Sequence, residues 1–92
     1  MQVGHEFADA DRMSDRFAVV LKEAVCAERG RLNITQQALA DRMGWSRGQV
    51  TCVESGARRI HAHELPDLCR ALEVRLSDLI GRASPEDRYW LS

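Results

Sequence analysis

The pattern of apolar and polar positions along the chain predicts five short helices. They are expected at residues 15–29, 36–43, 47–54, 64–72 and 77–81. In the first stretch, one helical face collects the apolar residues Phe17, Val20, Leu21, Ala24 and Val25. Ser14 is expected to cap this helix and Gly30 to stop it. The sequence therefore predicts an all-α fold, a compact bundle of five short helices.

The sequence pattern at the two ends of the chain differs from that of the bundle, which is expected to span residues 14–83. Residues 1–13 show little periodicity, so they are expected to form a flexible extension or to add a turn to the first helix. Ser84 and Pro85 are followed by two acidic residues, which is a signal for the start of a helix. An extra C-terminal helix within residues 84–92 is therefore expected.

Residues 35–54 have the spacing of two helices joined by a tight turn. Leu39, Val50 and Val53 are expected to face a shared core, and the small Ala40 is expected where the helices cross. Two helices held at a fixed angle in this way can present one of them to a DNA groove. The alternative is an ordinary helical hairpin that binds nothing.

Capping and turn residues in the same stretch favour the first interpretation. Thr35 and Ser46 are expected to cap the two helices by accepting hydrogen bonds from unpaired backbone N–H groups. Gly44 and Gly56 are expected to end them in the left-handed conformation, which costs little without a Cβ.

The distribution of charge also favours a DNA-binding role, although the net charge of the whole chain is −1. Residues 1–28 sum to −3 and residues 60–92 to −2, whereas residues 29–59 sum to +4. The positive block contains six arginines and coincides with the helix pair. A local basic patch of this kind is what phosphate binding requires. The alternative is a chance cluster of solvated arginines.

Other features of the sequence narrow the class of protein. Its 92 residues form one small domain, and we see neither a membrane-length apolar run nor a signal-peptide pattern, so a cytoplasmic protein is expected. The three cysteines are widely spaced, which disfavours a zinc site or a disulfide framework, and Cys26 and Cys69 are expected in the core. His61 and His63 lack further ligands for a metal site. Without a catalytic constellation, a non-enzyme with no cofactor and no metal is expected.

With these motifs in hand, the chain resembles the lambda-repressor-like, Xre/Cro family of helix-turn-helix domains over roughly residues 21–80. The segments that carry the resemblance are TQQALADRMGWS, VTCVESGARR and ELPDLCRALEVRLSDLI. The resemblance implies a lambda-repressor-like bundle and a transcriptional regulator. It further implies that the protein binds double-stranded DNA as a homodimer on a palindromic operator, with helix 47–54 in the major groove.

The resemblance also implies which residues meet the DNA. Gln36 would contact phosphate, and Arg58 and Arg59 would lie near the DNA backbone or the adjacent minor groove. The residues expected to face the major groove are Ser46, Arg47, Gly48, Gln49 and Cys52. Thr51 is expected at most to touch the DNA backbone.

The groove-facing residues differ in what they are expected to do. Arg47 is the strongest candidate for reading a base, because arginine to guanine is the commonest specific contact; the alternatives are a phosphate contact or a free surface arginine. Gln49 is expected to bond adenine or phosphate, or to be solvated. Gly48 suggests a close approach of DNA, since glycine is costly in a helix. Cys52 is expected to be inert, with a thymine-methyl contact or a redox switch as alternatives.

Two departures from the family concern the core rather than the groove-facing residues. Many members carry an arginine late in helix one that pairs with the glutamate matching Glu54, but residues 24–27 here read AVCA, so Glu54 is expected to pair elsewhere or to cap. The connection between the first two helices also looks about two residues longer than usual.

The last expectations concern partners. Tyr89, Trp90 and Leu91 are large side chains in the C-terminal segment, and they are expected to join Leu79 and Ile80 in the dimer interface. The alternative is that they fold back on their own core. A second function, an antitoxin that binds a toxin protein and its own operator, also fits the resemblance.

Overall fold

Six helical segments make up the computed structural model, which describes the backbone of residues 3–81 and the side chains of residues 15–81. Five are α-helices: α1 (Val3–Leu32), α2 (Gln36–Met43), α3 (Arg47–Ser55), α4 (Leu65–Ala71) and α5 (Leu76–Ile80). One turn of 3-10 helix, η1 (Ala62–Glu64), precedes α4. No strand occurs within residues 3–81. The predicted all-α fold of five helices is therefore confirmed.

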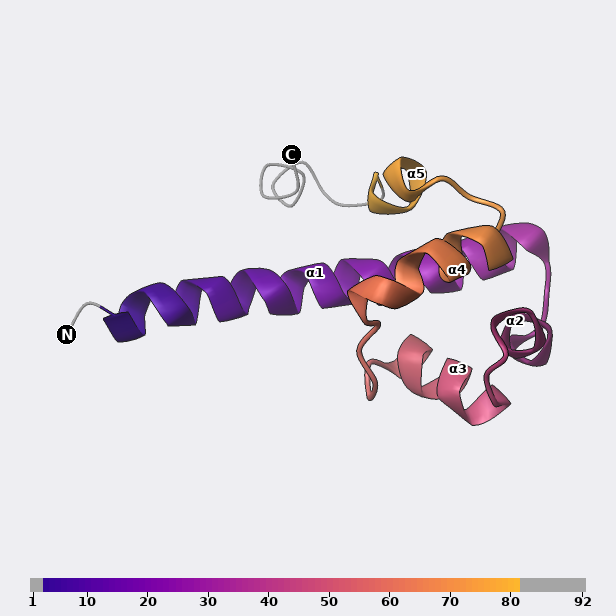
Figure 1. The fold of residues 1–92 in the computed structure, drawn as a ribbon, viewed down its shortest axis with the longest axis horizontal. Coiled ribbons are helices and arrows are strands. Elements are labelled where there is room, and N and C mark those ends of the chain that lie inside the picture. Colours follow the sequence, from indigo (N-terminus) through magenta and orange to yellow (C-terminus); the bar gives the residue numbers. More distant parts are fainter. Residues whose placement is uncertain (1–2, 82–92) are drawn as a thin grey trace.

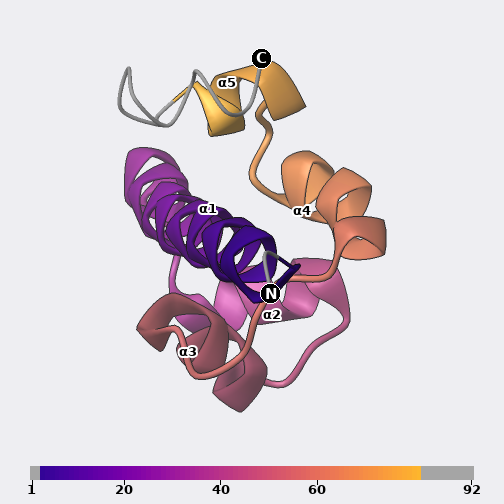
Figure 2. The same ribbon diagram turned by 90° about the vertical axis from the view of Figure 1, so that its left-hand side faces the viewer.

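Helix α1 is the axis around which the others are arranged (Figure 1). Its C-terminal half contacts α3 on one side and α5 on another, while α2 contacts α3 and α4. Viewed along α1, α2 and α3 lie below it, α4 beside it and α5 above it (Figure 2). The N-terminal half of α1 projects beyond the other helices. Helix α3 is therefore held on an outer face of the bundle.

Every α-helix contributes at least one fully buried side chain to the core. The largest of these are Val25, Leu39, Val50, Val53, Leu68 and Leu79, and Leu72, directly after α4, is also fully buried. Leu39, Val50 and Val53 were expected there, and Ala40 is fully buried as expected for a crossing point between α2 and α3. Burial of this apolar surface stabilises the fold because it removes the surface from water.

Helix α1 is longer than predicted at both ends. It begins at Val3, so Ser14 lies inside it and is not its cap. Gly30 does not stop it either; the helix continues to Leu32 and ends at Asn33, whose φ is 55°. The Asn33 and Ile34 N–H groups donate to the carbonyls of Gly30 and Arg29, respectively, which is the Schellman ending. Asparagine tolerates the left-handed conformation, so it can replace the expected glycine.

The other helices lie close to their predicted places. Helix α2 has the predicted bounds, and α3, α4 and α5 differ from prediction by one residue at one or both ends. Helix α4 is followed by Glu73 in a left-handed conformation, with φ of 54°. Val74 N–H then donates to the Cys69 carbonyl, which repeats the ending of α1.

The structure tests the predictions for the chain ends only in part. Residues 84–92, with the expected C-terminal helix, lie outside the described residues. Helix α1 runs through residue 13 without a break, which is the helix-extending alternative, while the division into a 1–13 extension and a 14–83 domain stays a prediction. Within the described part of the chain, no helix combines the length and the apolar character needed to span a bilayer.

Candidate nucleic-acid interface

Helices α2 and α3 are joined by the tight turn that the sequence predicts. Gly44 ends α2 with φ of 72°, and Gly56 ends α3 with φ of 87°. Thr35 Oγ1 accepts a hydrogen bond from Ala38 N–H at 3.0 Å, which caps α2. Ser46 Oγ accepts from Gln49 N–H at 3.2 Å, which caps α3. These four predictions are confirmed, and they set where each helix of the pair begins and ends.

One face of α3 is buried and the opposite face is open to solvent. Val50 and Val53 are each 1 % exposed and pack inward. The residues expected to face the DNA groove are all exposed: Ser46, Arg47, Gly48, Gln49 and Cys52. Thr51, expected at most to touch the DNA backbone, is exposed as well. The fold therefore brings this predicted set together on one outward surface, which we call the α3 face.

Arg47 differs from every other arginine between residues 29 and 59. Each of the others has a carboxylate within ion-pair distance: Arg29 with Glu54, Arg31 with Glu28, Arg42 with Glu73, Arg58 with Glu64 and Arg59 with Asp15. Arg47 has no such partner within the described residues. The positive block of the sequence is therefore largely neutralised in the fold. Its one arginine without a carboxylate partner among residues 15–81 stands at the first position of α3.

Glu54 is the centre of a polar cluster that joins three helices. Arg29 of α1 donates from Nε to Glu54 Oε2 at 2.7 Å and from Nη2 to Oε1 at 3.1 Å. Gln36 of α2 donates from Nε2 to the same Oε1 at 3.0 Å. Thr51 of α3 donates from Oγ1 to Gln36 Oε1 at 3.2 Å. The angle between α2 and α3 is thus secured by hydrogen bonds as well as by the apolar core.

Electrostatics in this cluster favour the charged form of Glu54. Burial alone would raise its pKa, but the hydrogen bonds from Arg29, Gln36 and Cys26, together with the positive charge of Arg29, outweigh burial and hold the pKa of Glu54 below its ordinary value. The neighbouring Cys26 responds in the opposite sense. Burial, followed by the charge of Glu54, raises the pKa of its thiol. The buried carboxylate is therefore part of the folded structure in its ionised form.

The arginine that pairs with Glu54 was missed by the sequence analysis. Residues 24–27 hold none, and a helix ending before Gly30 would leave Arg29 at its frayed end. Because α1 continues to Leu32, Arg29 is inside the helix and reaches Glu54. The signal that could have located it is the asparagine at residue 33, which can end a helix as glycine does.

Two residues predicted to contact DNA use their side chains within the protein. Both ends of the Gln36 amide are engaged, by Glu54 and Thr51. Gln49 Oε1 accepts from Ser46 N–H at 3.0 Å and completes a capping box. The sequence predicts neither of these contacts. To contact DNA, either side chain would have to exchange these intramolecular hydrogen bonds for hydrogen bonds to DNA.

Arg58 is held in place by its neighbours. Its guanidinium lies over the Trp45 ring, 4.8 Å from the centroid. It also donates to both carboxylate oxygens of Glu64, at 3.2 Å and 2.6 Å. These hydrogen bonds lower the pKa of Glu64. The turn residue Trp45 and the loop after α3 are thereby fastened to each other.

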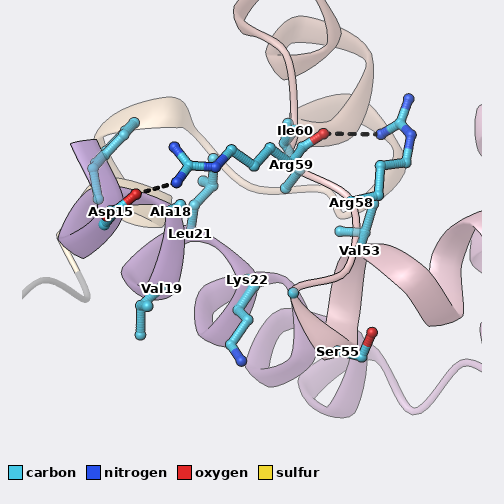
Figure 3. Close-up of a pocket in the computed structure, with 12 residues that line it drawn as sticks. Asp15, Ala18, Val19, Leu21, Lys22, Val53, Ser55, Arg58, Arg59 and Ile60 are labelled. Atoms are coloured by element: carbon cyan, nitrogen blue, oxygen red, sulfur yellow. Dashed lines mark hydrogen bonds and ion pairs between the residues drawn. The ribbon is translucent and has the colours of Figure 1, made fainter. Parts of the chain in front are cut away.

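Arg59 turns the opposite way, toward α1 (Figure 3). Its guanidinium donates to Asp15 across a groove of about 410 Å³ between α1 and the loop after α3. Apolar side chains line much of this groove, among them Phe17, Val19 and Ile60.

The residues expected in a dimer interface have different surroundings. Leu79 is fully buried in the core of a single chain, so in this fold its side chain cannot also pack against a second copy. Ile80 is half-buried, and the neighbouring Leu76 is 45 % exposed. Tyr89, Trp90 and Leu91 lie outside the described residues.

Among the described residues, the remaining histidines and cysteines do not come together in a site. His61 and His63 stack with their ring centroids 5.6 Å apart, but no group of three potential metal ligands occurs among the described residues. All three cysteines are free thiols, with Cys52 exposed and Cys26 and Cys69 half-buried rather than fully in the core.

Comparison with known proteins agrees with this geometry. A family model described as a helix-turn-helix domain matches residues 25–80, from the last turns of α1 to the end of α5. Searches among curated proteins and among solved structures each found no match. The family match covers more than half of the chain and includes both α2 and α3. The chain therefore belongs to the helix-turn-helix domain family.

Proposed function

We propose that this protein is a sequence-specific transcriptional regulator of the lambda-repressor-like Xre/Cro type, and that it places α3 in the major groove of its operator. The observation that carries the proposal is the α3 face, where Arg47 stands at the first helical position and has no ion-pair partner among the described residues. The N-terminal residues of a recognition helix are those that reach base edges. An arginine there can form a bidentate contact with guanine.

The start of α2 supports the proposal with a site for the DNA backbone. Thr35, Gln36 and Gln37 line a shallow depression together with Arg29 and Arg47. The first turn of α2 contains no acidic residue. No carboxylate from that turn therefore neutralises the positive end of the helix dipole. A phosphate at this position would anchor α2 while α3 enters the groove. Gln36 would then contribute its backbone N–H, leaving its side chain to hold Glu54.

The proposed functional unit is a homodimer on a palindromic operator. Half-sites about one helical turn, roughly 34 Å, apart would match a two-fold axis between two copies of α3. Ile80 and the exposed Leu76, both on α5, are described apolar residues that could meet a second copy, with Tyr89, Trp90 and Leu91 as further candidates. Deletion of residues 84–92 tests the contribution of the tail. A truncated protein that remains dimeric by light scattering would remove the tail from the interface.

The decisive experiment is selection of bound duplexes from a random pool, followed by titration of the selected site and of a scrambled site. Arg47→Ala should cost about 1–3 kcal/mol on the selected site and relax preference at one base pair per half-site. Arg75→Ala is the matched control. Arg75 is also exposed and has no ion pair among the described residues, but it precedes α5, on the other side of α1 from α3 (Figures 1 and 2).

Each outcome of that experiment bears on a different part of the proposal. Equal losses for Arg47→Ala on the selected and scrambled sites would reject the base contact. A pool without enrichment would leave only electrostatic attraction to DNA. The antitoxin alternative predicts the same DNA binding together with a toxin complex, and it stays a prediction.

A further inference from the structure

We infer that Asp15 competes with DNA phosphate for the guanidinium of Arg59, and that α1 thereby limits the affinity of the DNA interface. The inference rests on the proposed function and concerns how the same surface is controlled. Arg59 is one of the two arginines expected near the DNA backbone in the loop after α3. The structure shows its charge directed to the Asp15 carboxylate on α1 instead.

The pair is a long-range contact between otherwise separate parts of the fold. Asp15 belongs to α1, and Arg59 lies 44 residues later, beyond the left-handed Gly56 that ends α3. Figure 3 shows the Arg59 side chain extended along the groove to reach Asp15, while Arg58 points away from it. Within the described residues, Asp15 is the only partner of the Arg59 guanidinium. Loss of this single contact would therefore release the whole charge.

Exposure indicates that this contact can be exchanged. The Arg59 and Asp15 side chains are 57 % and 62 % exposed, whereas those of Arg58 and Glu64 are 25 % and 12 % exposed. Exposed ion pairs are weak because water screens them. Arg58 is also fixed by the Trp45 ring, so it is the poorer candidate for a new partner. Of the two loop arginines, Arg59 can exchange a carboxylate for a phosphate at the lower cost.

The exchange of Asp15 for a DNA phosphate at Arg59 has a predictable effect on the salt dependence of DNA binding. When Arg59 moves to a phosphate, Asp15 loses its partner and attracts a cation from solution. That uptake offsets part of the counterion release that drives association with DNA. Removal of the Asp15 charge should therefore strengthen binding and also steepen its dependence on salt.

The test measures binding of the full chain to a fluorescent random-sequence duplex of about 30 base pairs, at about 50 mM and about 200 mM salt. Asp15→Asn is compared with Asp67→Asn, which changes net charge equally. Asp67 also faces an exposed arginine, Arg70, at 3.6 Å, but both lie on α4. Both aspartates are exposed, so neither change should disturb the core, and thermal melting checks this.

At low salt, we expect Asp15→Asn to tighten binding by up to about fivefold more than Asp67→Asn, with a salt slope steeper by up to about one. In an Arg59→Ala background, this difference should vanish. Equal effects of the two changes, or a difference that persists without Arg59, would overturn the inference while leaving DNA binding intact. A wild-type protein that does not bind the duplex at low salt would reject the proposed function, and this inference with it.

Discussion

Arg29 of α1 and Glu54 at the end of α3 form a part-buried ion pair, with Arg29 Nε 2.7 Å from Glu54 Oε2. Arg29 Nη1 also donates to the Ile34 carbonyl at 2.9 Å, in the connection that leads to α2. One arginine therefore ties α3 to α1 and to the chain segment that positions α2. The orientation of the α3 face depends on this contact, although Arg29 itself is not on that face.

Arg29→Ala should destabilise the protein by about 2–3 kcal/mol. The change leaves the Glu54 carboxylate, only 8 % exposed, without its ionic partner, and an uncompensated buried charge is costly. The cost is discounted because the Arg29 side chain is 24 % exposed. Urea unfolding measures it. Arg70→Ala, which removes an exposed arginine paired at 3.6 Å, is the control and should cost less than about 0.5 kcal/mol. Equal costs for the two variants would mean that the Glu54 cluster contributes no special stability.

Stability should fall in acid partly through Glu54. Its pKa is lower in the folded state than the roughly 4.3 of an unfolded glutamate, so the unfolded state binds the proton first as the pH falls. The stabilisation is fully present above the unfolded pKa and is lost as the pH falls through the folded pKa. Urea titrations across this range should show a shallower pH dependence for Glu54→Gln than for the wild type. Glu23→Gln, which removes a carboxyl group from an exposed part of α1 outside the Glu54 cluster, is the control.

Two glycines should respond to alanine with opposite signs. Gly44 has φ of 72°, where a Cβ is strained, so Gly44→Ala should destabilise the protein by about 1 kcal/mol. Gly30 lies within α1, and a Cβ there would meet nothing within 4 Å. Gly30→Ala should therefore stabilise the protein by about 0.5–1 kcal/mol. Thermal unfolding of both variants measures the two stability changes. A destabilised Gly30→Ala protein would contradict the continuous helix through residue 30.

Gly48→Ala should separate stability from DNA binding. A Cβ at residue 48 would lie 3.8 Å from Ser46 Oγ, an ordinary contact, so the free protein should gain about 0.5 kcal/mol. If DNA approaches this part of α3 closely, the added methyl group should weaken binding to the selected site. Unfolding and binding titrations on one preparation measure both effects. Unchanged affinity would show that DNA leaves room for a side chain at this position.

Bound DNA should protect Cys52 from a thiol reagent. Cys52 is exposed on the α3 face, whereas burial raises the pKa of the Cys26 and Cys69 thiols and leaves less of the reactive thiolate. Labelling should therefore show one fast thiol, which disappears in Cys52→Ser. Saturating duplex should slow that phase, and duplex at high salt should not. A fast phase unaffected by bound DNA would place this part of α3 outside the interface.

The helix pair was predictable because its determinants are local. Thr35 bonds to the N–H of Ala38, and Ser46 bonds to that of Gln49, so each cap lies within three residues of its partner. The left-handed conformation of Gly44 likewise depends on the residue itself. The end of α1 was less predictable, because asparagine in place of glycine gives a weaker signal for the same Schellman ending.

The sequence alone therefore determined the all-α class, α2 with its bounds, α3 to within a residue, and the side of α3 that faces the core. These features follow from periodicity and from contacts within a single turn of helix. Only the tertiary structure decided which arginines of the positive block form ion pairs. The partners of Arg29 and Arg59 lie 25 and 44 residues away, on α3 and α1 respectively. Charge counted along the chain cannot register such pairs, since they exist only once packing brings distant segments together. Packing left Arg47 as the arginine of that block with no ion-pair partner in the part of the chain that the structure describes.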